Sequence, residues 1–144
     1  MFDIAIKHFT DCDGAILAAA VADFTPSNTH DEKLKKDENN KQLTITLKQT
    51  QDILGTLGKM KQHQKLVGFA LETNNEVENA KTKLKKKNLD FIVLNSLKDK
   101  GSGFQSNTNK ITIIDKNENM LEFDLKDKRD VAHDIVNCFK DLFN

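Results

Sequence analysis

The sequence has few of the residues that mark loop-rich, disordered or membrane proteins. It contains one proline and six glycines among 144 residues, which argues against a disordered or loop-rich chain. No apolar run approaches the roughly 20 residues that a membrane span requires, and the amino terminus lacks the pattern of a secretory signal. We therefore expect a cytoplasmic protein with no membrane partner.

The chain also lacks an excess of charge of either sign. Lys and Arg total 22, Asp and Glu total 22, and the formal net charge is zero. A neutral chain of this kind has no overall field that would draw it onto a polyanion. We expect no nucleic-acid partner.

Cysteine and histidine are scarce and scattered. Cys12 and Cys138 stand near opposite ends of the chain, and the four histidines form no HxH or HExxH pair. Neither a disulfide framework nor a zinc site follows from such spacing. The sequence therefore predicts no metal site made by protein side chains alone.

The hydrophobic pattern alternates short apolar runs with amphipathic segments. It predicts strands at residues 15–22, 42–48, 66–71, 90–94, 110–115 and 120–125, and helices at residues 2–9, 52–62, 75–87 and 128–143. The run at 15–22 also fits a short buried helix. The order predicts a single α/β domain over residues 1–144. Its sheet is expected to be Rossmann-like, open and mostly parallel, with helices on both faces and a small antiparallel β extension.

Open α/β sheets bind ligands at the carboxyl ends of their strands. The residues that follow the expected strands are Asp23, Glu72–Asn75 and Asn95. Asn95 fits a loop cap or a ligand contact, and Thr73 and Glu76 have the spacing of a helix capping box. The chain contains neither GxxxxGK[ST] nor GxGxxG, so any nucleotide must be held without those phosphate-binding loops.

Four motifs follow one another along the chain: LAAAVADFTP, KLKK, LVGFALET and AKTKLKKKNLDFIVLN. In this order and spacing they resemble the phosphopantothenoylcysteine synthetase family, CTP-dependent ligases of bacterial coenzyme A synthesis that are often fused to a flavin-dependent decarboxylase. The resemblance extends over essentially the whole chain and includes GFQSNTN. The family's glycine-rich GGT-type strand and SNxSSG-like segment do not occur in this sequence, which looks like the carboxyl-terminal two thirds of such a domain.

The resemblance implies a CTP pocket and a catalytic lysine, Lys33. The residues at positions that match the family's CTP pocket are Leu17, Ala18, Ala19, Asp23, Lys33, Thr50, Gln51, Asp52, Ile53, Phe69, Lys83 and Lys87. Mg²⁺ would arrive with the nucleotide, with Asp23 as the nearest candidate carboxylate. FMN would belong only to a fused decarboxylase domain.

Several of these residues also have a purely structural interpretation. The small alanines fit close helix packing as well as close approach of a base, and Asp23 fits a turn cap as well as a ligand to ribose or Mg²⁺. Lys33, like Lys35 and Lys36, fits a solvated loop.

The remaining implied positions also have structural interpretations. Lys83 and Lys87 lie four residues apart on one helix face, where they fit either a helix-dipole interaction or a triphosphate clamp. Phe69 fits the core or the border of a base.

The resemblance implies ligation of 4′-phosphopantothenate with L-cysteine through an acyl-cytidylate. It also implies a homodimer, with residues 42–48 as the expected pairing strand. A catalytically incomplete nucleotide-binding or dimerisation module is the alternative. A dinucleotide oxidoreductase is disfavoured because no glycine fingerprint precedes a helix. The sequence does not separate CTP from ATP.

Overall fold

The computed structural model describes residues 1–29, 32–33, 42–96 and 106–144. These residues form two compact units. The sheet unit comprises Met1–Ala18 and Ile53–Asn144, and the two-stranded unit comprises Ala19–Asp52. The predicted positions Lys35 and Lys36 lie outside the described residues.

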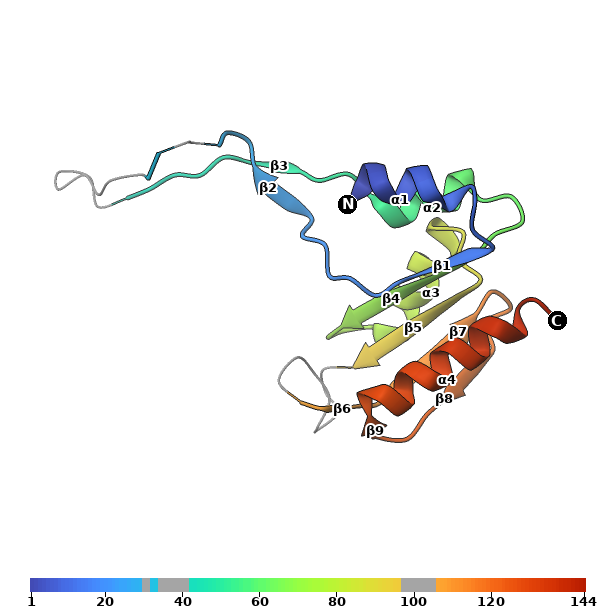
Figure 1. The fold of residues 1–144 in the computed structure, drawn as a ribbon. Helices are drawn as coiled ribbons and strands as arrows, with labels where there is room; N and C mark the ends of the chain where they lie inside the picture. Colours follow the sequence, from blue (N-terminus) through green and yellow to red (C-terminus); the bar gives the residue numbers. More distant parts are fainter. Residues whose placement is uncertain (30–31, 34–41, 97–105) are drawn as a thin grey trace. The chain divides into compact units, whose positions relative to one another are not determined.

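A five-stranded sheet organises the sheet unit (Figure 1). Its strands, in spatial order, are β1 (Gly14–Leu17), β4 (Lys65–Glu72), β5 (Phe91–Ser96), β7 (Ile111–Asp115) and β8 (Met120–Glu122). β1, β4 and β5 are parallel, whereas β7 is antiparallel to both β5 and β8. Four of the five strands therefore run in one direction, which confirms the predicted mostly parallel α/β sheet.

Helices cover both faces of this sheet, as predicted (Figure 1). On one face, α1 (Phe2–Phe9), α2 (Ile53–Met60) and α3 (Glu76–Lys86) contribute to a core that contains Leu57, Leu66, Leu84 and Ile92. On the other face, α4 (Lys128–Asp141) packs Val131 and Ile135 against Val67 and Val93. We call these the α3-side and α4-side cores. Successive residues of β4 and β5 alternate between them, as the two-residue period of a strand requires.

The first strand, β1, ends earlier than the apolar run at residues 15–22 predicts. The prediction of a buried strand over residues 15–22 is wrong beyond Leu17, because Ala18 to Ala22 form no strand and are exposed. The ladder with β4 ends at the pair Leu17↔Gly68. The alanine-rich continuation has low β-propensity, and without a partner strand its backbone leaves the sheet.

The two-stranded unit pairs β2 (Phe24–Pro26) with β3 (Leu47–Gln49) in an antiparallel ladder. The predicted half-buried strand over residues 42–48 is wrong, because only its last two residues fall in β3 and its apolar positions are exposed. The exposed fractions of Leu43, Ile45 and Leu47 are 69%, 58% and 53%. The alternation correctly indicates an apolar face, but no layer of the described chain covers it.

The starts of α3 and α4 differ in how they are capped. Asp127 caps α4, where its side chain accepts a hydrogen bond from the Arg129 backbone N–H at 2.8 Å. The predicted capping box before α3 is wrong. Asn75 is the N-cap in a left-handed conformation, with φ of 47°, and its side chain makes no capping bond. Asparagine tolerates this conformation better than most residues.

A buried carboxylate joins α2, β4 and β5 at the amino end of the parallel strands. Asp90 is 6% exposed, and its Oδ2 accepts hydrogen bonds from Lys61 Nζ at 2.9 Å and from the Leu66 backbone N–H at 2.8 Å. The Asp90 backbone N–H in turn donates to the Leu66 carbonyl at 2.9 Å. A buried charge needs such partners, and the two hydrogen bonds between Asp90 and Leu66 tie the start of β5 to β4.

An exposed ion-pair network holds α3 to the turn between β7 and β8. Glu118 pairs with Lys85 and, at 3.0 Å, with Lys81. Hydrogen bonds from both ammonium groups lower the pKa of Glu118 to about 2. This network supports α3, the helix that contains the predicted site residue Lys83 and is capped by Lys87.

We predict that Asp90→Ala lowers the free energy of unfolding by about 3–5 kcal/mol, because it leaves the Lys61 ammonium buried without a counter-charge. Urea denaturation followed by circular dichroism measures the change. The double variant Lys61→Met with Asp90→Ala should recover part of the loss. A loss for Asp90→Ala below about 1 kcal/mol, typical of exposed pairs, would contradict this assignment.

Candidate functional site

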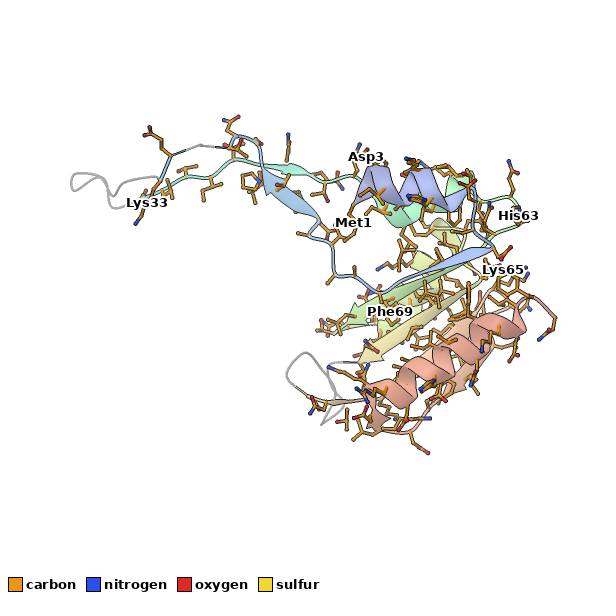
Figure 2. All side chains as sticks on the ribbon, viewed as in Figure 1. Met1, Asp3, Lys33, His63, Lys65 and Phe69 are labelled. Atoms are coloured by element: carbon orange, nitrogen blue, oxygen red, sulfur yellow. The ribbon has the colours of Figure 1, made fainter. Side chains whose placement is uncertain are left out.

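The carboxyl end of β1 carries the first predicted site residues of the sheet unit. Leu17 is the last residue of β1, and Ala18 follows it. Leu17 packs against the α3-side core, which includes Ile53 at the start of α2. Phe69 lies on β4, where it is labelled in Figure 2, and its half-buried side chain packs on the α4-side core. Backbone ends and side chains from several elements thus meet at this edge.

Lys83 reaches the sheet at the point where β1 leaves it. The Lys83 Nζ donates a hydrogen bond to the Phe69 carbonyl at 2.8 Å. Phe69 is one residue beyond Gly68, the last residue of β4 that pairs with β1. The ammonium therefore satisfies a carbonyl next to the end of the ladder, and its other N–H groups remain to bind an anion.

Lys87 occupies a different place on the same helix. It is the C-cap of α3, and its backbone N–H donates to the Lys83 carbonyl. Its own carbonyl lies against Gly58 of α2, where a β-carbon would clash with it. Lys87 is thus one helical turn from Lys83, toward the carboxyl end of α3. The structure places Lys83 at the Phe69 backbone and Lys87 at the junction of α2 and α3.

The two-stranded unit brings two other predicted residues together. The Thr50 backbone N–H donates to the Asp23 carbonyl at 2.8 Å, and Thr50 Oγ1 donates to the Ala22 carbonyl at 2.7 Å. The Asp23 carboxylate is exposed, as are Ala19, Lys33, Gln51 and Asp52. An exposed lone carboxylate fits a metal ion delivered on a nucleotide better than a metal held by a protein cage.

The predicted site is divided equally between the units, with six residues in each. The sheet unit holds Leu17, Ala18, Ile53, Phe69, Lys83 and Lys87, and the two-stranded unit holds Ala19, Asp23, Lys33, Thr50, Gln51 and Asp52. The chain passes between the units at Ala18–Ala19 and at Asp52–Ile53. Both passages consist of predicted site residues.

Sequence reasoning missed a set of uncharged polar contacts near the same carboxyl edge. Asn109 Nδ2 donates to Asn95 Oδ1 at 3.0 Å, and the hydroxyl groups of Ser106 and Thr108 lie 2.8 Å apart. Thr108 and Asn109 form β6, which pairs with β9 (Lys126–Asp127). Asn95 alone carried a signal in the sequence, because it follows a predicted strand.

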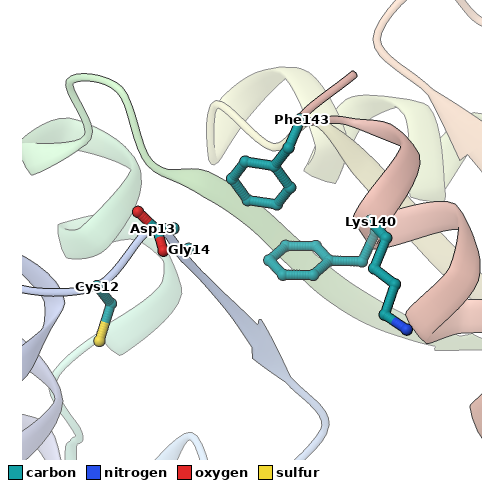
Figure 3. A pocket seen from close by; sticks show the side chains of 6 residues that line it. Cys12, Asp13, Gly14, Lys140 and Phe143 are labelled. Atoms are coloured by element: carbon teal, nitrogen blue, oxygen red, sulfur yellow. The ribbon is translucent and has the colours of Figure 1, made fainter.

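A shallow pocket of about 410 Å³ lies at the other end of β1 (Figure 3). Its lining includes Cys12, Gly14 and two rings, Phe139 and Phe143. Gly14 begins β1, so this pocket lies at the opposite end of the strand from the predicted residues Leu17 and Ala18. The second cysteine, Cys138, has its pKa raised mainly by burial, which disfavours the reactive thiolate.

The described ranges contain neither a metal-binding cluster of side chains nor a membrane-spanning helix. Within residues 1–29, 32–33, 42–96 and 106–144, no group of three or more His, Cys, Asp or Glu side chains is arranged to hold a metal ion. In the same ranges, no helix has the length and apolar character needed to cross a membrane.

Comparison with known proteins gives concordant matches along the chain. The family described as DNA/pantothenate metabolism flavoprotein C-terminal domain matches residues 1–142. The Coenzyme A biosynthesis bifunctional protein CoaBC of Bacillus subtilis (strain 168) is 42% identical over 136 residues, which cover 94% of this chain and 33% of that protein. A crystal structure of the C-terminal domain of CoaBC is 36% identical, with a TM-score of 0.75, over 99% of this chain and 62% of that one.

Another relative carries a different description. A protein from an unknown prokaryotic organism, described as Cysteine/Cysteine sulfinic acid decarboxylase, is 56% identical over 137 residues, which cover 94% of this chain and 38% of that protein. The chain thus spans between a third and two fifths of the length of these two curated relatives.

We predict that Lys83→Ala weakens binding of a Mg²⁺–nucleoside triphosphate at least tenfold, or roughly 1.4 kcal/mol, and lowers the free energy of unfolding by about 1 kcal/mol through the lost hydrogen bond to Phe69. Lys83→Ala with Lys87→Ala should weaken binding further and leave the fold intact. Calorimetry and urea denaturation measure the two effects.

Lys86→Ala is the matched control, since Lys86 is exposed on the same helix. Equal binding by the Lys83 and Lys86 variants would show that Lys83 has only a structural role. If the double variant Lys83→Ala with Lys87→Ala does not fold, both lysines have a structural role.

Proposed function

This chain belongs to the DNA/pantothenate metabolism flavoprotein C-terminal domain family, and we propose that it carries out the CTP-dependent ligation of 4′-phosphopantothenate with L-cysteine in coenzyme A biosynthesis. The observation that carries the proposal is the 36% identity, over 99% of this chain, to the solved C-terminal domain of CoaBC. The positions of Leu17, Phe69 and Lys83 where the β1–β4 ladder ends support it.

In the proposed first step, a carboxylate oxygen of 4′-phosphopantothenate attacks the α-phosphorus of CTP. The bond from the α-phosphorus to the bridging oxygen breaks, pyrophosphate departs, and a mixed anhydride with CMP remains. In the second step the cysteine amine attacks the activated carbonyl, loses a proton and displaces CMP. Such chemistry depends on positioning the reactants and on neutralising phosphate charge rather than on a protein nucleophile.

The chain's own groups fit these demands. Lys83, with N–H groups beyond the one bound to Phe69, is proposed to bind phosphate, and Lys87 is proposed to add a second cation. The exposed Asp23 carboxylate is proposed to approach Mg²⁺ on the nucleotide. Lys33, also exposed, is proposed to engage the phosphate as charge develops on it.

A homodimer is part of the proposal. The two-stranded unit exposes a series of large apolar side chains, namely Val21, Phe24, Leu43, Ile45 and Leu47. Contiguous exposed apolar surface marks interaction sites. We propose that a second copy of the chain covers this surface, with residues 42–48 in the contact.

The decarboxylase description of the 56% identical relative offers a second function. We propose that any decarboxylation belongs to parts of such proteins outside the region that this chain matches, where FMN would bind. Release of CO₂ from L-cysteine or cysteine sulfinate by the 144-residue chain would contradict that division.

We predict that Mg²⁺–CTP raises the melting temperature of the chain more than Mg²⁺–ATP does, because a ligand that binds only the native state stabilises it by mass action. At one hundred times the dissociation constant the gain is about 2.7 kcal/mol. Differential scanning fluorimetry at matched nucleotide concentrations measures both shifts. Equal shifts, or none at millimolar concentration, would refute the CTP site.

We predict that Lys33→Gln lowers kcat and kcat/KM together by roughly 10²-fold, by analogy with the loss of one oxyanion donor. CTP affinity should stay nearly unchanged, because the lysine acts only as charge develops. Turnover is measured in this chain extended at its amino end by the corresponding segment of the Bacillus subtilis relative.

The control for Lys33 is Lys36→Gln, a change in the same charged run, which should leave turnover nearly unaltered. If the two variants behave alike, the KLKK segment is a solvated charge run and Lys33 has no catalytic role.

A further inference from the structure

A hydrogen-bonded pair of amide side chains lies at the carboxyl edge of the sheet and has no part in the mechanism above. Asn95 is the penultimate residue of β5, Asn109 is the last residue of β6, and Asn109 Nδ2 donates to Asn95 Oδ1 at 3.0 Å. Both residues are half-buried. We call them the amide pair.

The amide pair is close to a predicted site residue. Phe69 of β4 is in register with Val93 of β5, and Asn95 is two residues further along β5. Residues two apart on a strand share a face, so Asn95 is on the α4-side face with Val93 and Phe69. The amide pair is therefore one side-chain position closer to the carboxyl edge than Phe69.

The hydrogen bond within the pair leaves specific groups available. Asn95 Oδ1 is occupied, but Asn95 Nδ2 retains two N–H donors and Asn109 Oδ1 retains its acceptor sites. Among residues 1–29, 32–33, 42–96 and 106–144, nothing binds these groups. Both side chains are half-buried and neither is a buried unsatisfied group, so these donors and acceptors are accessible to an external partner.

The neighbouring groups of the amide pair favour an uncharged partner. Ser106 and Thr108 precede Asn109, and their hydroxyl groups contact each other. Lys110, which follows Asn109, already has an interaction partner. Lys126, which is in register with Asn109, has its ammonium paired with Asp134 at 2.6 Å. Lys83 comes from α3, on the opposite face of the sheet. A phosphate group of a ligand therefore suits the α3 side, where Lys83 lies. Uncharged amide and hydroxyl groups of a ligand suit the α4 side.

We propose that the amide pair binds the α-hydroxy-amide portion of the acid substrate, and this proposal rests on the function proposed above. In 4′-phosphopantothenate a hydroxyl group and an amide carbonyl stand on adjacent carbons. Asn95 Nδ2 donates to that carbonyl, and Asn109 Oδ1 accepts from that hydroxyl. The pair thereby orients the acid so that its carboxylate approaches the nucleotide, and it acts as a specificity determinant that touches no reacting atom.

The deciding variant is Asn95→Asp. It keeps an oxygen to accept from Asn109 but removes both N–H donors and adds a negative charge. Asn137→Asp is the matched control, because it makes the same change at an exposed position on α4. Calorimetry measures Mg²⁺–CTP binding first. It then measures binding of 4′-phosphopantothenate, or of pantothenate without the phosphate, to the chain saturated with Mg²⁺ and α,β-methylene-CTP.

We expect Asn95→Asp to weaken the binding of 4′-phosphopantothenate and of pantothenate by the same factor, roughly tenfold or more. This factor corresponds to a lost hydrogen bond of about 1.4 kcal/mol. CTP affinity should change less than twofold, and Asn137→Asp should change neither. Unaltered acid binding would overturn the proposal. Loss of CTP affinity would assign the pair to the nucleotide, and a loss confined to the phosphorylated acid would assign it to phosphate. Either result contradicts the proposal.

A second measurement does not depend on the variant's folding. In the unaltered chain, the Nδ2 proton resonances of Asn95 should shift when pantothenate is added, and those of the exposed Asn137 should not. Constant Asn95 resonances in a chain that binds the acid would overturn the proposal. If the unaltered chain binds neither nucleotide nor acid, the proposed function itself fails, and this inference fails with it.

Discussion

The early end of the β1–β4 ladder is the constraint on which the site depends. Backbone pairing stops at Leu17↔Gly68, so the next residue of β4 lies beyond the reach of β1. The Phe69 carbonyl still needs a donor, because an unpaired backbone group near the core is costly, and the Lys83 ammonium supplies it at 2.8 Å. The ammonium is thus held where the β1–β4 ladder ends, at the point where the chain leaves for the two-stranded unit.

The rest of the sheet unit holds that edge in place. The buried Asp90 ties β4 to β5 and α2 at the amino end of the strands, and Glu118 ties α3 to the β7–β8 turn. Because strands and helices are stiff, register fixed at one end is kept at the other. The two faces then offer different chemistry, a lysine from α3 on one side and amides from β5 and β6 on the other. That division suits the first step of the proposed reaction, in which the acid would attack the nucleotide.

Burial patterns within one segment could be predicted from the sequence, whereas pairings between segments could not. LVGFAL and DFIVL are short and dense in apolar side chains, and both are strands with buried residues on both faces. AILAAAVA is as apolar, yet it is a strand only to Leu17, since a ladder depends on a distant partner. QLTITLK has the alternation of a strand but nothing in the described chain covers its apolar face. The acceptor of Lys83 is a backbone carbonyl, which no side-chain pattern reveals, and the partner of Asn95 is 14 residues away across another strand.

The central claim is that nucleotide binds where β1 leaves the sheet, and isotope-edited NMR of the chain during titration with Mg²⁺–CTP tests it most directly. The account predicts that the largest shifts occur at the Phe69 carbonyl carbon, the Lys83 side chain and the Leu17 amide, with little change at Gly14 and Phe143. Shifts concentrated at Gly14 and Phe143, in the pocket at the opposite end of β1 (Figure 3), would contradict it.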